Sequence, residues 1–261
     1  MRISIVTISY NQREFLAQAI DSVLAQQGVE FEYIIVDPGS TDGSRELIQS
    51  YGARIHRHVF EPDRGAADGL NKGFALATGE ILGFLNSDDE FLPGALAAAR
   101  RELMRRPDVD FLSGCGYLID AAGSRTRRIV PTELTIDDYV HGSATLFQQG
   151  TFFRRKCLER SGGFNPDNRT SWDGELFLDF LRLGARHAVI YEDLAHFRIH
   201  GGSISGSGRC LDQYLRDSDR LFQKAKGRSP SPADRFVGRA YRATKILRHP
   251  RYALERLARR A

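Results

Sequence analysis

Short apolar runs alternate with segments of helical spacing along the first part of the chain. Runs rich in β-branched residues predict strands over residues 2–9, 31–36, 54–60 and 80–86. Between them, apolar side chains recur at three- and four-residue steps and predict helices over residues 15–24, 45–51, 66–77 and 93–105, with Asn11 as the cap of the first. Strands that alternate with helices predict an α/β protein with a doubly wound, mainly parallel sheet.

The second part of the chain has shorter predicted strands, over residues 108–114, 116–120, 124–131, 151–154 and 194–199, and a helix over 155–161. A further helix is predicted through WDGELFLDFLRLG, after Ser171. Leu176 and Phe177 mark its buried face, and Asp173, three and four residues earlier, points the same way. Glu175 and Asp179 fall on the opposite side, where we expect solvent exposure and pairing with Arg182.

Polar and acidic residues follow each of the first four predicted strands. They are Thr7, Ser9, Tyr10 and Asn11, then Asp37, then Glu61, Asp63 and Arg64, then Asn86, Ser87, Asp88 and Asp89. The carboxyl ends of parallel strands share one edge of the sheet, where ligands bind in this class of fold. Carboxylates gathered there repel one another, and a hard cation such as Mg²⁺ or Mn²⁺, shared with a nucleotide diphosphate, is the usual way to hold them together. For residues 87–89 alone, a turn that caps the next helix is the alternative.

Two residues of the second part are candidates for chemistry. Asp173 is a lone inward carboxylate and has the character of a general base, although an acid at a helix start is also favoured by the helix dipole. His200 follows the last predicted strand, in a polar loop with Ser203 and Ser205. A lone histidine is usually structural, so the role of His200 depends on its neighbours.

The chain has 261 residues, of which 41% are hydrophobic, so it forms one large domain or one domain with a small appendage. No apolar run approaches the roughly 20 residues that cross a bilayer, and the N-terminus lacks the pattern of a signal peptide. We therefore expect a cytoplasmic protein. Cys115, Cys157 and Cys210 are odd in number and widely spaced, which argues against a disulfide framework and a cysteine-rich zinc site.

The net charge of +4 conceals a basic C-terminal segment. Residues 224–261 carry 12 Lys and Arg against 2 Asp and Glu, a net charge of +10, which leaves −6 for residues 1–223. Apolar residues recur within it at helical steps: Phe236, Ala240, Ala243 and Leu247, widened by Tyr241 and Ile246 and repeated by Leu254 and Leu257. Such a segment is a helix packed on the domain, a helix on an anionic membrane surface, or a nucleic-acid-binding arm.

Several motifs occur in the order and spacing of a known family: ISIVTISYNQ, IIVDPGSTDGS, EPDRGAADGLNKGFALATGEILGFLNSDD, and GGFNPD followed by WDGELFLDFLRLG. On these motifs the chain resembles the inverting family 2 glycosyltransferases of GT-A fold, and a branch associated with bacterial surface-polysaccharide assembly. The resemblance implies a GT-A domain over residues 1–205, with a nucleotide-sugar-binding half at 1–113 and an acceptor-binding half at 114–205. Residues 206–261 are then a helical basic C-terminal extension.

The resemblance also assigns donor-site roles. Residues expected to bind the donor nucleotide or flank its pocket are Thr7, Ser9, Asn11, Asp37, Arg64, Asp68, Asn71, Lys72 and Asp88. The NSDD stretch corresponds to the DxD-like site of the family, and either Asp88 or Asp89 can be the direct ligand of Mn²⁺ or Mg²⁺. His200, within RIHGGSIS, corresponds to the histidine that completes the metal site or contacts the diphosphate.

On the acceptor side, Asp173 corresponds to the catalytic base of the family, although Trp172 stands where many members have a preceding acid. Gln149, Thr151, Arg154 and Trp172 are the expected acceptor-binding residues; ordinary strand packing is the alternative for the segment QQGTFFRR. Two other departures, Pro38 in place of an acid and Ala67 in place of an aromatic residue, leave the donor base and sugar open.

The implied function is metal-dependent, inverting transfer of a sugar from a nucleotide-diphosphate sugar, with a UDP-sugar as first choice. The implied acceptor is a hydroxyl of a glycan or lipid-linked molecule in surface polysaccharide biosynthesis. A lipid-linked acceptor gives Lys224 to Ala261 a reason to lie on the inner face of the plasma membrane, and nucleic acid is not expected as a partner. A catalytically inactive GT-A protein that binds a nucleotide sugar or glycan is the alternative. TISYNQREF lacks the Gly-rich phosphate loop that a nucleotidyltransferase or dinucleotide oxidoreductase needs.

Overall fold

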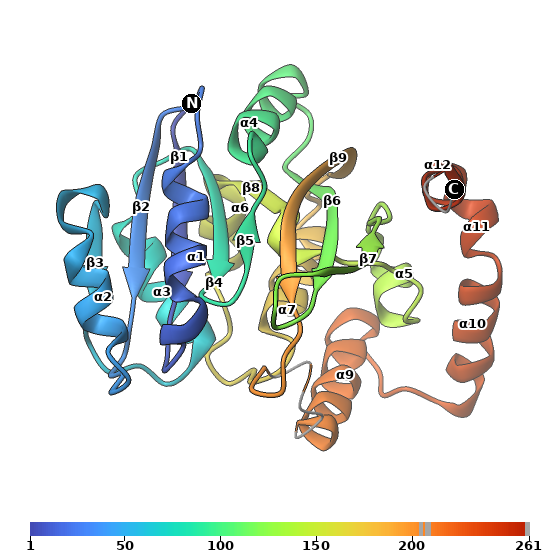
Figure 1. Ribbon diagram of the computed structural model, residues 1–261. Helices are drawn as coiled ribbons and strands as arrows, with labels where there is room; N and C mark the ends of the chain where they lie inside the picture. The colour runs from blue at the N-terminus through green and yellow to red at the C-terminus, as the bar shows by residue number, and fades with distance from the viewer. Residues whose placement is uncertain (204–205, 207–209, 259–261) are drawn as a thin grey trace.

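The computed structural model describes residues 1–203, 206 and 210–258, and a single mixed sheet runs through it (Figure 1). The strands are β1 (Ile3–Ile8), β2 (Phe31–Val36), β3 (Arg57–Val59), β4 (Ile81–Asn86), β5 (Glu90–Phe91), β6 (Phe111–Ile119), β7 (Arg125–Ile129), β8 (Thr151–Arg154) and β9 (His187–Arg198). Their spatial order is β3-β2-β1-β4-β8-β6-β9-β5, and β7 pairs with β6. Strands β3, β2, β1 and β4 are mutually parallel, so their carboxyl ends share one edge.

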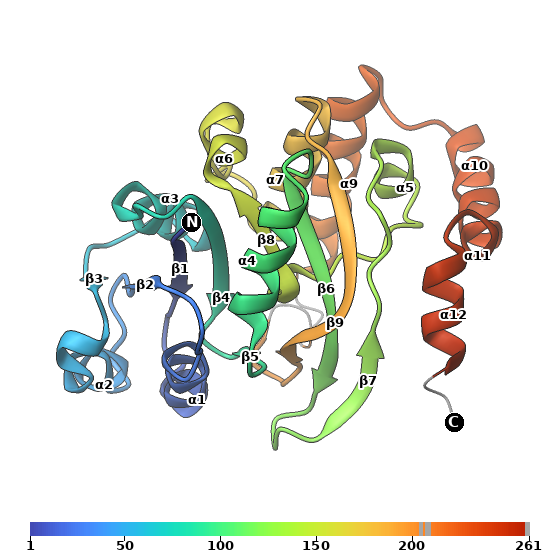
Figure 2. The same cartoon turned by 90° about the horizontal axis from the view of Figure 1, so that it is seen from above.

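Helices cover both faces of this sheet. They are α1 (Arg13–Leu24), α2 (Ser44–Ser50), α3 (Ala66–Leu76), α4 (Ala95–Arg105), α5 (Ile136–Val140), α6 (Arg155–Ser161), α7 (Trp172–Arg182), α9 (Leu211–Lys226), α10 (Pro232–Ala243), α11 (Lys245–Arg248) and α12 (Pro250–Ala258). Successive strand residues point to opposite faces, so Ile5 joins an apolar cluster with α1, α2 and α4, and Val6 joins another with α3, α6 and α7. Figure 2 shows α1 and α2 on one side of the sheet and α3 on the other.

The doubly wound first half confirms the predicted alternation, with two local differences. Strand β3 covers only residues 57–59 of the predicted 54–60, because Arg54 ends a short 3₁₀ turn. The predicted cap at Asn11 is wrong, because α1 begins at Arg13 with Gln12 at its N-cap. Asn11 has a φ of 50°, and its side-chain oxygen accepts a hydrogen bond from the Thr41 amide at 2.9 Å. Asn11 therefore joins the loop after β1 to the loop after β2.

Strand β6 is continuous where the sequence predicted two strands separated at Cys115. The glycines on either side of Cys115 do not break the strand; they allow close approach of neighbouring elements. A Cβ atom at Gly116 would collide with the Ala195 carbonyl oxygen of β9 and the Phe147 ring, and one at Gly114 would collide with the Leu194 side chain. The pairing of β6 with β9 shifts register around Cys115, as expected where backbone is packed tightly against backbone.

Helices α9 to α12 form the predicted helical C-terminal region. Helix α9 packs on α5 and α7 and buries Leu221 and Phe222. Helix α10 begins with Pro232, and the Asp234 carboxylate accepts a hydrogen bond from the Ser231 amide at 2.7 Å. Ser205 and the side chain of Leu257 lie outside the described residues. Across the described part of the chain, we find no helix whose length and apolar character would let it cross a bilayer.

We predict that Gly116→Ala lowers the free energy of unfolding by about 1–3 kcal/mol, because the added methyl group must displace β9 or Phe147. Gly201→Ala is the matched control, since a Cβ at Gly201 meets nothing within 4 Å. Urea denaturation of the two variants gives the comparison. Equal stability of Gly116→Ala and the wild type would contradict the close approach described for β6.

Candidate functional site

A cavity of about 670 Å³ opens at the carboxyl ends of the parallel strands. Its walls come from both halves of the chain: Ser9 and Tyr10 after β1, Pro38 and Gly39 after β2, Pro62, Asp63, Gly65 and Ala66 at the start of α3, Asn86 to Asp88 at the end of β4, and Gln148, Gln149, Trp172 and Asp173 from the second half. Its volume is within the usual range of small-molecule sites. A neighbouring cavity, lined by Asn11, Asp42 and His200 among others, shares Tyr10, Gln12 and Gly202 with the first.

Asp37 and Thr7 support the wall of the cavity from behind. Asp37 is fully buried, and its carboxylate accepts hydrogen bonds from the Gly39 amide at 3.1 Å, the Ser40 amide at 2.8 Å and Arg45 Nε at 3.2 Å. The Asp37 carboxylate thereby shapes the turn whose residues 38 and 39 line the cavity. The Thr7 hydroxyl is buried and accepts a hydrogen bond from the Tyr33 hydroxyl at 3.0 Å.

Ser9 and Asn86 reach the cavity itself, and each carries a polar atom that needs a partner. Ser9 Oγ and Asn86 Oδ1 are buried and have no hydrogen-bond partner among the described residues. Buried polar groups are normally hydrogen-bonded, and an exception calls for a water, an ion or a ligand. These two atoms therefore mark the part of the cavity wall that is incomplete without a bound group.

The two acids after β4 have different surroundings. Asp88 lines the cavity, and its Oδ2 lies 3.1 Å from His200 Nε2. Asp89 is fully buried, and its carboxylate accepts hydrogen bonds from the Arg198 amide at 2.9 Å, Gln149 Nε2 at 2.9 Å and Asn86 Nδ2 at 3.2 Å. Burial, with the neighbouring Asp88 charge, raises the pKa of Asp89. The sequence left open which of the two acids is the direct metal ligand; of the two, only Asp88 lines the cavity.

Arg198 is a supporting residue to which the sequence assigned no role, although it begins the RIHGGSIS motif. Its guanidinium is buried and donates to the carbonyl oxygen of Asp88 at 2.9 Å, to Ala121 O at 3.2 Å and to Gln18 Oε1 at 2.7 Å, and it forms an ion pair with Glu90. Arg198 thus fixes the backbone of the acidic loop against α1 and the turn between β6 and β7.

The four residues predicted to flank the donor pocket around α3 brace the cavity wall without lining it. Asp68 accepts a hydrogen bond from the Arg64 amide at 3.0 Å, and Lys72 donates to the Pro62 carbonyl oxygen. The Asn71 side chain bonds both the amide and the carbonyl oxygen of Phe164, each at 2.8 Å. The contacts of Asp68 and Lys72 hold the segment before α3, which includes the lining residues Asp63 and Gly65, and those of Asn71 join α3 to the loop after α6.

The expected acceptor residues separate into two groups. Gln149 and Trp172 line the cavity, whereas Thr151 is buried and its hydroxyl donates to the Phe147 carbonyl oxygen at 2.7 Å. Arg154 lines neither cavity. Its guanidinium donates to Val109 O at 2.8 Å and Leu103 O at 2.6 Å, since β8 runs antiparallel to β4 and carries its last residue away from the ligand edge.

Asp173 lines the cavity from the first turn of α7, as its predicted inward direction requires. Its carboxylate accepts a hydrogen bond from the Gly174 amide at 2.8 Å, and burial raises its pKa. Trp172, the residue before it, packs against the rings of Phe84 and Phe164 at centroid distances of 5.6 and 6.0 Å. A carboxyl group with a raised pKa in a cavity has the properties of a general acid or base.

The prediction that Glu175 is exposed and pairs with Arg182 is wrong. Glu175 is only 1% exposed, and its partners are Arg220 and Lys224 of α9 with Asn165 and Asn168 of the preceding loop. Arg182 pairs with Asp179, as predicted for the second of the two acids. The helical pattern placed Glu175 correctly on the side of α7 away from the sheet, but that side is covered by α9, which lies some forty residues further along the chain.

Comparison with known proteins identifies the class. The sequence profile described as "Glycosyl transferase family 2" matches residues 4–162. The uncharacterized glycosyltransferase alr2836 of Nostoc sp. is 33% identical over 216 residues, which are 78% of this chain and 66% of that protein. The succinoglycan biosynthesis protein ExoU of Rhizobium meliloti is 28% identical over 257 residues, covering 91% of this chain and 73% of ExoU.

Two solved structures share the fold. S. aureus TarS 1–349 in complex with UDP-GlcNAc superposes with a TM-score of 0.71, covering 95% of this chain and 73% of that one at 18% identity. The mannosyltransferase PcManGT from Pyrobaculum calidifontis, in complex with GDP-Man and Mn²⁺, gives a TM-score of 0.66 over 98% of this chain and 73% of that one, also at 18% identity. The chain belongs to glycosyl transferase family 2 and has the GT-A fold. It is a glycosyltransferase.

Proposed function

We propose that this glycosyltransferase uses a divalent cation to transfer a sugar, with inversion, from a UDP-sugar to a hydroxyl of a glycan or lipid-linked acceptor in surface polysaccharide biosynthesis. The observation that carries the proposal is that Asp88, in contact with His200, and Asp173 reach the same cavity from opposite halves of the molecule. The succinoglycan name of ExoU supports the pathway, and UDP-GlcNAc in TarS supports the donor class.

The residues around Asp88 fit a divalent cation bound together with a diphosphate. Among the residues that the structure describes, no three His, Cys, Asp or Glu gather into a metal site. Asp88, His200 and the unpartnered Asn86 Oδ1 nevertheless offer the oxygen and nitrogen ligands that Mn²⁺ and Mg²⁺ accept, and donor phosphates supply the rest. A cation held by these residues would offset the negative charge on the departing nucleoside diphosphate. We assign Asp88 as the direct ligand and Asp89 as its support, since the Asp89 oxygens already have donors.

Asp173 serves as the general base. Its carboxylate takes the proton of the acceptor hydroxyl while that oxygen attacks the anomeric carbon, and the bond to the donor phosphate oxygen breaks on the opposite face of the sugar. The configuration inverts, and the nucleoside diphosphate leaves with the electrons of the broken bond. Ser9 and the turn at residues 38 and 39 hold the nucleotide, whereas Gln149 and Trp172 border the space for the acceptor. General base catalysis of this kind contributes about 10² to 10⁴ in rate.

The surface of the basic C-terminal segment, residues 224–261, suits a peripheral contact with a membrane. Part of its charge is used within the protein, because Lys226, Arg242 and Arg248 bind Asp137, the His141 carbonyl oxygen and Asp138. Three apolar side chains of this segment are uncovered: Phe236 is 68%, Leu247 80% and Leu254 66% exposed, and Arg235 and Arg239 are exposed beside Phe236. Apolar side chains flanked by arginines suit an anionic leaflet, where each cation contributes about 1 kcal/mol.

We expect a cation-dependent response to one donor when the purified protein is screened with MnCl₂ and UDP-glucose, UDP-galactose, UDP-GlcNAc or GDP-mannose. The readouts are thermal stabilisation and slow release of nucleoside diphosphate. EDTA and Asp88→Asn should abolish both, and Asp219→Asn, an exposed acid on α9, should change neither. Binding without release for any donor, even with glycan acceptors added, would favour the catalytically inactive alternative.

The pH dependence of turnover follows from the raised pKa of Asp173. A base works only when deprotonated, so raising its pKa moves the loss of activity to higher pH. We expect the acid limb of the kcat profile to have its midpoint above the ordinary aspartate value of about 3.9. Asp173→Asn should lower kcat by about 10²-fold or more and leave the Kd for Mn²⁺ and UDP within twofold. An acid limb that persists unchanged in Asp173→Asn would assign it to another group.

Sedimentation with vesicles tests whether the basic C-terminal segment binds a membrane. We expect the protein to bind vesicles rich in phosphatidylglycerol, and the triple variant Phe236→Ser, Leu247→Ser, Leu254→Ser to lose most of that binding. Met104→Ser combined with Leu183→Ser, which are exposed apolar positions on α4 and just after α7, is the matched control. Wild-type protein that fails to bind anionic vesicles at low salt would contradict the membrane contact.

A further inference from the structure

We propose that helix α9 is part of the catalytic apparatus and that Glu175, held by Arg220 and Lys224, is a positioning residue for Asp173. The inference rests on the proposed role of Asp173 as the general base. It extends that role to a segment outside residues 4–162, over which the family profile matches. We call Glu175, Asp217, Arg220 and Lys224, together with Asn165, Asn168 and Thr170, the α7–α9 clasp.

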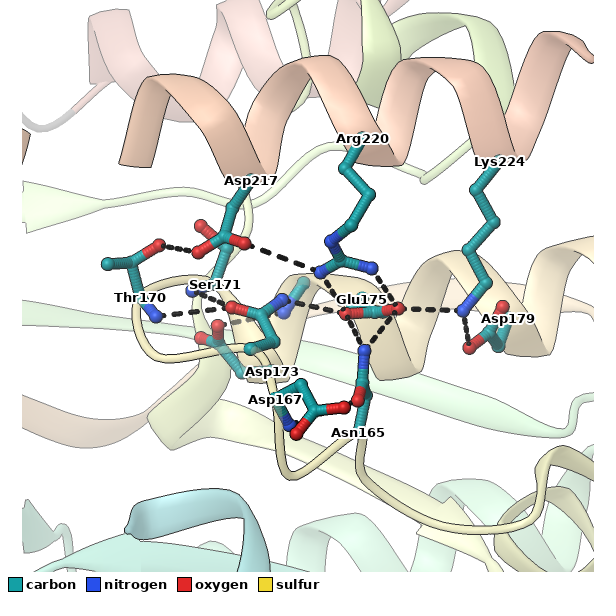
Figure 3. Close-up of polar contacts among 12 residues, drawn as sticks. Asn165, Asp167, Thr170, Ser171, Asp173, Glu175, Asp179, Asp217, Arg220 and Lys224 are labelled. Carbon is teal, nitrogen blue, oxygen red and sulfur yellow. Dashed lines mark hydrogen bonds and ion pairs between the residues drawn. The ribbon is translucent and has the colours of Figure 1, made fainter. Parts of the chain in front are cut away.

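The centre of the clasp is a buried carboxylate with two cations. Glu175 lies two residues after Asp173, in the same first turn of α7. Its oxygens accept hydrogen bonds from Arg220 Nη1 at 2.8 Å and Nη2 at 2.6 Å, and from Lys224 Nζ at 2.8 Å. Figure 3 shows both cations reaching down from α9 to Glu175, with Asp173 and Asn165 below. The paired geometry of the arginine fixes direction as well as distance.

The clasp also holds the loop that leads into α7. Asn168 donates to Glu175 at 2.8 Å, and its own oxygen accepts hydrogen bonds from the Thr170 amide at 3.1 Å and the Ser171 amide at 2.9 Å. The Thr170 hydroxyl donates to the buried carboxylate of Asp217 at 2.7 Å. Because Thr170, Trp172 and Asp173 all line the cavity, the contacts from α9 hold the segment that forms this part of the cavity wall.

The charges of the two acids in this turn are arranged in opposite ways. Two cations and several hydrogen bonds lower the pKa of Glu175 to about 2, so that it stays ionised, whereas burial raises the pKa of Asp173, whose carboxylate accepts the Gly174 amide. Environments that shift the pKa values of two neighbouring acids in opposite directions are typical of sites in which the two acids have different roles. The Glu175 carboxylate keeps its charge, balanced by two cations, and is held in place. The Asp173 carboxylate remains available to accept a proton.

Stability alone is a weak reason for such an arrangement. A buried ion pair adds little net stability compared with apolar residues of the same volume, since both charges lose water. What the clasp provides is a fixed tilt and rotation of the first turn of α7. A misplacement of about 1 Å of a reacting group can cost 10²-fold in rate, so the orientation of this turn matters directly to a base at position 173.

The test compares Glu175→Gln and Arg220→Met with Arg216→Met as control. Arg216 is exposed on the same helix, and its guanidinium contacts Gln213. Trp172 is the only tryptophan of the chain, so its fluorescence reports on this turn without any substrate. We expect acrylamide quenching of Trp172 to increase at least twofold in both clasp variants and to stay unchanged in Arg216→Met. Thr170→Val removes only the hydrogen bond to Asp217 and should give a smaller increase in Trp172 quenching. This variant replaces the other two as the test if they fold poorly.

Kinetics then separates positioning from general destabilisation. With a donor that the wild type hydrolyses in the presence of MnCl₂, Glu175→Gln should lower kcat 10- to 100-fold and leave the KM for that donor within twofold. Arg220→Lys, which keeps the charge, should recover part of the loss. Unchanged Trp172 quenching overturns the clasp, and increased quenching with unchanged kcat overturns its catalytic role. A wild type that turns over no donor contradicts the proposed function instead, and the quenching result still decides whether the clasp holds this turn.

Discussion

The structure depends on how the acids at one edge of a parallel sheet are kept from repelling one another. Asp37 and Asp89 are each surrounded by hydrogen-bond donors of the protein, from Gly39, Ser40 and Arg45 in one case and from Asn86, Gln149 and Arg198 in the other. Their charges are satisfied before any ligand arrives. Asp63, Asp88 and Asp173 are acids that line the cavity, so the fold separates the carboxylates that hold the loops from those that face the cavity.

The two halves of the molecule act as one body because they share both the sheet and these hydrogen bonds. Strand β8 pairs with β4 on one side and β6 on the other, and so joins the strands of the first half to those of the second. Gln149 and Arg198, from the second half, hold Asp89 and the backbone of Asp88 in the first. A structural change in either half therefore alters the position of the loop that carries Asp88 and Asp89.

Local pattern was sufficient to predict the parallel strands, the helices between them and the polar residues at the strand ends. Those features depend on side-chain periodicity and on a general property of parallel sheets. The direction of Asp173 was predicted for the same reason, from its spacing to Leu176 and Phe177. The fold class followed from the alternation of strands and helices, and the family from motifs that are each continuous in the sequence.

Features that depend on distant partners were not predictable in this way. Glu175 was predicted to lie on the surface because no residue near it in the sequence indicates that α9 covers it. The glycines around Cys115 were interpreted as a strand break because the β9 residues that they contact lie far along the chain. Arg154 belongs to the segment QQGTFFRR, which was expected near the acceptor, but the direction of β8 carries Arg154 to the opposite edge of the sheet. Which of Asp88 and Asp89 is accessible likewise depends on Gln149 and Arg198, more than fifty residues away.

The contact of α9 with α7 has a consequence for how the protein unfolds locally. Leu221 and Phe222 are buried beside a shared set of ion pairs, so detaching α9 exposes apolar surface and leaves the Glu175 charge without its cations at the same moment. Such coupled losses make two helices exchange their amide hydrogens as one cooperative unit rather than fray separately. We therefore expect the slow-exchanging core of this protein to reach beyond the sheet and to include α9, the first described helix of the C-terminal region.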